Sequence, residues 1–137
     1  MAEGSYATNR GSSEADTWVL SLEQELAENV KDLRDSDGIF VSESAIRACL
    51  LWARALAPFL ISSPSLKSGA FAEDDGCVAL VVHSLATGRR LTCRVSADGN
   101  TVRVIQIDER MKSEVSHLSL RDKDTPRELA GWVLATA

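Results

Sequence analysis

Three strand-like runs joined by two short glycine-containing turns occupy residues 77–107, and they limit the possible folds more than any other feature. The runs read CVALVVHS, RRLTCRVS and TVRVIQI, and the turns contain Thr87-Gly88 and Asp98-Gly99. Apolar and polar residues alternate in these runs, as in strands with one buried face. Turns this short join neighbouring antiparallel strands. The segment therefore predicts a three-stranded meander, to which residues 70–72 can add an edge strand.

The turns also predict how the strands pair. Two-residue turns at Thr87-Gly88 and Asp98-Gly99 place particular residues of neighbouring strands opposite one another. The expected pairs are Val82 with Cys93, Leu80 with Val95, Val95 with Val102, and Cys93 with Val104. All of these side chains fall on one face, which we expect to be buried. At residues 104–107 apolar residues occur on both faces, which a bulge or a partner covering the second face would each explain.

Two helices are predicted before the strands and one after them. Residues 16–35 carry apolar residues at three- and four-residue steps, and Gly38 supplies the conformation that often ends a helix. Ser42 suits the N-cap of a second helix, which is apolar almost all round over residues 45–59. Thr125-Pro126-Arg127-Glu128 is a strong start for a short terminal helix, with Thr125 as its cap. The apolar stripes are Val19, Leu22, Leu26, Val30 and Leu33 in the first helix, and Leu129, Trp132 and Val133 in the last.

This order of elements predicts an α+β fold. It consists of two N-terminal helices, a three- or four-stranded antiparallel β-meander and a short C-terminal helix, with the helices packed on one sheet face. A length of 137 residues fits one domain. Residues 1–15 are small and polar, so we expect a flexible N-terminal tail ahead of a single domain of residues 16–137.

The charge and the cysteines narrow the classes of function. The net charge is −5, which argues against a general nucleic-acid binder. Cys49, Cys77 and Cys93 form no C-x-x-C pair, so we expect reduced, structural thiols in a cytoplasmic protein. The most apolar stretch, residues 48–61, contains Arg54 and is too short to span a bilayer. We therefore expect no association with a membrane.

No motif in the sequence carries recognisable catalytic chemistry. His83 and His117 are the only histidines, and the alternation of a strand turns Ser84 away from His83. Residues 33–44 resemble a calcium loop at the third, fifth and sixth positions, but Leu and Ser occupy the first and last positions, where acidic ligands are needed. We therefore expect no enzymatic activity, no bound metal and no cofactor.

The clearest candidate binding surface is the sheet face that points away from the core. The candidate residues on or near it are Arg90, Arg94, Arg103, His83, Ile105 and Ile107. Arg94 is expected opposite Arg103, and like charges opposite each other across strands are unfavourable unless something neutralises them. An acidic partner or a small anion could do so. The chain's own Glu73, Asp74 or Asp108 could also do so, which would leave an ordinary solvated face.

A particular order of turns and apolar residues covers residues 64–132. It comprises an acidic-glycine turn at 74–76, Gly-Arg-Arg-Leu at 88–91, Ala-Asp-Gly at 97–99 and a final helix with Leu129 and Trp132. This order resembles a group of small uncharacterised bacterial α+β proteins that share such a strand–turn–strand ending behind an N-terminal helix. The resemblance covers about half of the chain, and it implies no activity, cofactor or functional residue.

These observations favour a small bacterial protein-interaction module, of the immunity, antitoxin-like or adaptor kind, over an enzyme. Its partner would be another protein or a second copy of the chain. Length, acidity and the mixture of helices with an antiparallel sheet are also similar to secretion chaperones, although those proteins place a helix among their strands. A third reading is an anion or nucleic-acid binder that uses Arg90, Arg94 and Arg103. The acidic composition makes nucleic acid the less expected ligand.

Overall fold

The computed structural model describes residues 2–61, 63, 65–118 and 124–135, and it places three helices and five strands in this part of the chain. The helices are α1 (Ala2–Asp37), α2 (Glu43–Leu60) and α3 (Thr125–Leu134). The strands are β1 (Leu66–Ala72), β2 (Val78–Ser84), β3 (Arg90–Val95), β4 (Val102–Ile107) and β5 (Ser113–Leu118). They form one antiparallel sheet in the order β1-β2-β3-β4-β5. The predicted α+β class and its order of helices, meander and final helix are confirmed.

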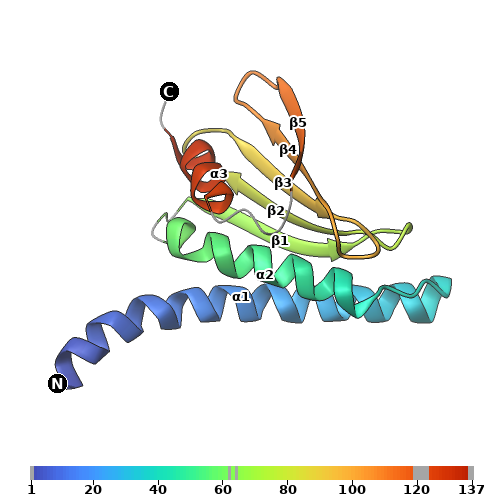
Figure 1. Ribbon diagram of the computed structural model, residues 1–137, viewed down its shortest axis with the longest axis horizontal. Helices are drawn as coiled ribbons and strands as arrows, with labels where there is room; N and C mark the ends of the chain where they lie inside the picture. Colours follow the sequence, from blue (N-terminus) through green and yellow to red (C-terminus); the bar gives the residue numbers. More distant parts are fainter. Residues whose placement is uncertain (1, 62, 64, 119–123, 136–137) are drawn as a thin grey trace.

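The helices lie on one face of the sheet (Figure 1). α1 packs along β1 and against α2, whereas α2 and α3 contact each other and lie on β2 and β3. β4 and β5 extend past this helical layer (Figure 1). In the described part of the chain, the opposite face of the sheet is therefore left without a covering layer.

The hydrophobic core lies between the helices and the sheet. Alternate residues of the strands enter it, because successive side chains of a strand point to opposite faces. Its largest fully buried side chains include Leu26, Leu56, Leu60, Leu80, Leu91 and Val104. The stripe predicted for α1 is confirmed, with Val19 and Leu22 buried and Val30 and Leu33 packed against the core. Leu51 of α2 does not enter the core: its side chain points away from it and is 56% exposed.

The reversal between α1 and α2 follows the predicted local signals. Gly38 has a φ of 67°, and its N–H donates to the carbonyl oxygen of Arg34 at 3.1 Å. Ser42 caps α2, since its Oγ accepts the N–H of Ala45 at 3.0 Å. The same hydroxyl donates to the carbonyl oxygen of Ala97 at 2.6 Å, which joins the start of α2 to the β3–β4 loop.

The predicted pairing of β3 with β4 is confirmed, and that of β2 with β3 is wrong by two residues. Between β3 and β4 the observed pairs are Val95 with Val102 and Cys93 with Val104. Between β2 and β3 they are Leu80 with Cys93 and Val82 with Leu91. A shift by two residues keeps every side chain on its face. The predicted buried face is therefore correct even though the partners differ.

The length of the β2–β3 loop explains the shift. The Ser84 N–H donates to the carbonyl oxygen of Arg89 at 3.0 Å, and the Gly88 N–H donates to the carbonyl oxygen of Ser84 at 2.9 Å. Residues 85–88 thus form a four-residue loop. The prediction had assumed a two-residue turn at Thr87-Gly88, which would place Ala86 rather than Ser84 opposite Arg89, two residues later along β2.

α1 begins earlier than predicted. The expected helix start at Asp16 was wrong, because the helix begins at Ala2. Figure 1 shows the N-terminal part of α1 projecting past the end of α2. The described packing against the core begins at Ala15. The domain boundary at residue 16 stays a prediction.

β5 is a strand that the sequence analysis did not find. The loop before it starts at Asp108, whose Oδ1 accepts the N–H groups of Arg110 and Lys112, each at 2.9 Å. These hydrogen bonds hold the pKa of the Asp108 carboxyl below its ordinary value, and the bond from the Lys112 N–H has the larger effect. The loop returns the chain so that Val115 pairs with Ile105. The sheet therefore has five strands rather than three or four.

Of the two explanations considered for residues 104–107, a bulge is excluded. β4 pairs with β3 without interruption from Val102 to Ile107. Val102 and Val104 enter the core, whereas Ile105 and Ile107 lie on the opposite face. The apolar residues change faces along a regular strand, and they supply the uncovered face with aliphatic side chains.

Candidate functional site

The candidate site is the sheet face opposite the helices, which we call the open face. The register arranges its side chains in three rows that run across the strands. The first row holds Phe71, Ala79, Arg94, Arg103 and His117; the middle row holds Gly69, Val81, Thr92, Ile105 and Val115; the last row holds Lys67, His83, Arg90, Ile107 and Ser113. All six residues predicted for this surface lie on it.

The rows keep Arg90 apart from the other two arginines. Arg90 and Arg94 lie four residues apart on β3, which corresponds to about 13 Å at the rise of a strand. Arg103 lies directly opposite Arg94, at the same end of the sheet. Between the two basic ends runs the middle row, whose members are mostly aliphatic. The open face therefore has an apolar strip across its middle, with basic groups along both sides of the strip. The three arginines do not converge on one point.

Arg94 has counterions of its own. Its Nη2 lies 2.7 Å from Oε2 of Glu73 and 2.5 Å from Oδ2 of Asp75, both in the β1–β2 turn. The N–H of Cys77 and the guanidinium of Arg94 hold the pKa of the Asp75 carboxyl below its ordinary value, the N–H having the larger effect. These carboxylates neutralise the charge that faces Arg103. Of the acidic residues suggested by the sequence, Glu73 does pair with Arg94.

Arg90 and Arg103 are exposed at the two ends of the open face. Among the residues that the structure describes, neither forms an ion pair. His83 is half-buried beside Arg90, and His117 is exposed beside Arg103. Of the three arginines, Arg90 and Arg103 therefore have charges available to a partner, whereas Arg94 does not.

Arg89 precedes β3 but belongs to a different contact. Its Nε lies 3.0 Å from Oε2 of Glu109, and its Nη1 donates to the carbonyl oxygen of Trp132 at 2.8 Å. The guanidinium also lies 5.2 Å from the centre of the Trp132 ring. Thr87 donates to the carbonyl oxygen of Val133 at 2.7 Å. The last turn of α3 has no basic residue of its own, so this loop satisfies its terminal carbonyls.

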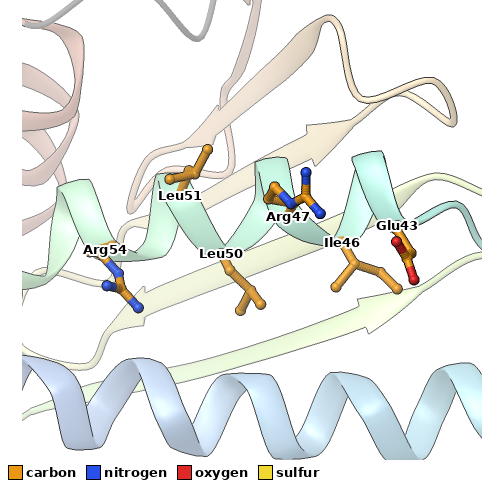
Figure 2. A pocket seen from close by; sticks show the side chains of 6 residues that line it. All are labelled: Glu43, Ile46, Arg47, Leu50, Leu51 and Arg54. Carbon is orange, nitrogen blue, oxygen red and sulfur yellow. The ribbon is translucent and has the colours of Figure 1, made fainter.

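A hollow of about 430 Å³ lies away from the open face, on the outer side of α2. Its lining residues are Glu43, Ile46, Arg47, Leu50, Leu51 and Arg54, which Figure 2 shows along one side of the helix. Ile46 and Leu50 also line a smaller hollow between α2 and α1. Sequence reasoning missed this surface because it described residues 45–59 as apolar almost all round and so did not single out an exposed side. The available signal was the seven-residue spacing of Arg47 and Arg54, which places both arginines on one side of the helix together with Leu50 and Leu51 between them.

Two of the three cysteines are buried, and the third is half-buried. Cys49 and Cys93 lie in the core, and burial raises the pKa of each thiol to about 12. Cys77 is half-buried, and burial raises the pKa of its thiol as well. Because the thiolate is the reactive form, high pKa values and burial both suppress reaction. No group of three potential metal-ligating side chains occurs in the described part of the chain.

We expect a thiol-specific reagent to modify Cys77 in the folded protein, and Cys49 and Cys93 only after unfolding. The physical reason is that the reagent must reach a thiolate, which the core excludes at both buried positions. Mass spectrometry of the protein labelled in buffer and in denaturant checks this. Cys77→Ser should abolish labelling in buffer, and rapid labelling of Cys93 in the folded state would contradict its buried placement.

Comparison with known proteins gives no relative for this chain: no protein family, curated protein or solved structure matches it. The resemblance to small bacterial α+β proteins therefore stays a prediction. Among the described residues, no helix is both long and apolar enough to cross a membrane.

Proposed function

We propose that the protein is a non-enzymatic interaction module, of the immunity, antitoxin-like or adaptor kind, that binds another protein through the open face. The observation that carries this proposal is the apolar middle row between two basic ends. Val81 and Ile105 are half-buried and Val115 is 45% exposed, so aliphatic surface remains accessible there. Interfaces typically combine such an apolar centre with a charged rim.

The charges of the open face define the chemistry of the partner. The strand residues on this face include Lys67, Arg90 and Arg103 but no carboxylate, although the whole chain has a net charge of −5. Electrostatic complementarity favours a partner with carboxylates at both ends of an aliphatic or aromatic centre. The partner that fits is therefore an acidic protein surface about as wide as the sheet.

The two other readings have less support. An anion site would need convergent cations, but Arg94 is occupied by Glu73 and Asp75, and Arg90 lies about four residues of strand away. A secretion-chaperone-like fold would place a helix among the strands, whereas here β1 to β5 follow one another directly. The open face of an uninterrupted sheet favours the interaction module.

We expect the Arg103→Glu/Ile105→Ser double variant to lose a protein partner that the wild type retains. The first change reverses a free charge of the rim, and the second removes aliphatic surface from the centre. Arg94 is left unchanged, because a carboxylate at that position would face Glu73 and Asp75 and disturb the turn. Affinity purification from native lysate, with quantitative mass spectrometry, measures the retained protein.

Arg127→Glu is the matched control, since it makes the same charge change on an exposed residue of α3, on the other side of the sheet. Circular dichroism establishes that all three proteins are folded. Equal recovery of the partner by the double variant and the wild type would contradict the proposal, as would the absence of any stoichiometric partner. Recovery of nucleic acid that falls steeply with salt would favour the anion reading instead.

A further inference from the structure

The two edges of the sheet differ in how they are protected. β1 forms one edge, and α1 lies along it. Oδ1 of Asn29 accepts the N–H of Ala72 at 2.6 Å, and Nε1 of Trp18 donates to Oγ of Ser68 at 2.8 Å. A helix thus covers the β1 edge and satisfies part of its backbone. β5 forms the other edge, and the helices contact β1, β2 and β3 instead.

The hydrogen-bond pattern shows which backbone groups β5 presents. The Asp108 N–H donates to the carbonyl oxygen of Lys112 at 3.0 Å, so these residues form a hydrogen-bonded pair. Such pairs alternate with non-hydrogen-bonded pairs along an antiparallel ladder. Residues 113, 115 and 117 consequently belong to non-hydrogen-bonded pairs with β4, and their N–H and C=O groups point away from β4. In the described part of the chain, nothing bonds to these groups.

β5 also lacks most of the devices that protect an edge. Natural edge strands are usually shortened, bulged or marked with Pro, Lys or inward-pointing charges. Glu114, on the same side of the sheet as Val104, is the one inward-pointing charge of β5, which contains neither Pro nor Lys. Ser113, Glu114, Val115 and His117 are exposed. Among the described residues, nothing therefore has to leave the edge of β5 before another strand pairs with it.

We propose that two copies of this chain pair through β5, antiparallel and about a two-fold axis centred on Val115. In this register Val115 faces Val115 of the second copy, Ser113 faces His117, and Glu114 faces Ser116. No like charges meet, so the strand is complementary to itself. The outward-pointing N–H and C=O groups of residues 113, 115 and 117 then form hydrogen-bonded pairs.

The surroundings of β5 allow this pairing. β4 and β5 extend past the helical layer, so the helices of one copy do not occupy the place of the other (Figure 1). A two-fold axis perpendicular to the sheet keeps both open faces on the same side. The middle row then continues across the join, from Ile105 through Val115 to the same residues of the second copy. The inference is independent of the proposed function, because the open face stays uncovered.

Val115→Pro tests the pairing with little effect on the fold. The Val115 N–H bonds to nothing within the sheet, so proline removes a bond to the second copy without removing one to β4. Val115→Thr is the control, since it keeps the N–H and a β-branched side chain. Sedimentation velocity is expected to give twice the chain mass of 14.8 kDa for the wild type and the Thr variant, and the chain mass for Val115→Pro.

Cross-linking provides the second measurement, should proline disturb the strand. In a Cys77→Ser background, Val115→Cys is expected to give a disulfide-linked dimer with diamide as the oxidant. Hydrogen-bonded antiparallel pairs have Cα atoms about 5.5 Å apart, which a disulfide can bridge. Ser113→Cys should not cross-link, because its two copies are about four residues of strand apart, roughly 13 Å.

A wild-type protein that stays monomeric up to its solubility limit would overturn the proposal. So would a dimer that persists in folded Val115→Pro and forms no Val115→Cys cross-link. If Arg103→Glu/Ile105→Ser dissociates that dimer instead, the copies meet through the open face and not through β5.

Discussion

Replacing Gly99 by alanine is expected to destabilise the protein more than the same change at Gly38. Both residues have positive φ values, 78° and 67°, so each alanine would be held in a left-handed conformation. Their surroundings differ. A Cβ on Gly99 would lie 2.7 Å from the carbonyl carbon and oxygen of Ser44, at the start of α2, whereas a Cβ on Gly38 meets nothing within 4 Å.

The expected losses follow from these two costs. Gly38→Ala should lower the free energy of unfolding by about 1–2 kcal/mol, the cost of the left-handed conformation alone. Gly99→Ala should lower it by about 2–5 kcal/mol, because the backbone of α2 or of the loop must also move. Urea unfolding followed by circular dichroism measures both values. Equal losses for the two variants would show that the β3–β4 loop does not press against the start of α2.

Replacing Leu80 by alanine is expected to lower the free energy of unfolding far more than replacing Leu51 by alanine. Leu80 of β2 is fully buried, whereas Leu51 of α2 is 56% exposed. Leu80→Ala removes buried methyl groups and leaves a cavity under the helices, which should lower the free energy of unfolding by about 2–5 kcal/mol. Leu51→Ala should change it by less than about 0.5 kcal/mol, as for other surface changes.

Urea unfolding of the two variants in parallel provides the measurement. The comparison is matched, because the same atoms are removed at both positions. A large loss for Leu51→Ala would indicate that the outer side of α2 is covered in solution, for example by another protein. A small loss for Leu80→Ala would contradict the placement of β2 at the centre of the core.

The strands and buried face of the meander could be predicted because local signals determine them. Apolar alternation set the face of each strand, and the turn at Asp98-Gly99 gave the correct register for β3 and β4. The register of β2 with β3 could not be read in the same way. Thr87-Gly88 resembles a two-residue turn, but Thr87 is engaged by the end of α3, and the loop closes at Ser84 and Arg89.

β5 could not be predicted because its sequence has no clear alternation. SEVSHL combines Val115 and Leu118 with two serines, a glutamate and a histidine, and its two apolar residues fall on opposite faces of the strand. Its position is set by the Asp108 loop and by pairing with β4, which are contacts between segments rather than properties of either one.

The candidate site was predicted in outline but not in its electrostatics. The alternation along β3 and β4 placed Arg90, Arg94 and Arg103 on one face, and the structure agrees. Which arginine is neutralised depended on the path of the β1–β2 turn, which brings Glu73 and Asp75 to Arg94. Nothing local to Arg94 signals this contact.

The neighbour-to-neighbour order of the strands has a consequence for how the chain folds. Each strand pairs only with the strands next to it in sequence, so every step of the sheet closes a short loop and loses little chain entropy. The contacts that join distant segments are those of the helices, such as Trp18 with Ser68, 50 residues apart, and Thr87 with Val133, 46 residues apart. The low contact order of the sheet allows it to form early. The docking of α1 and α3 closes the long loops and therefore loses the most chain entropy.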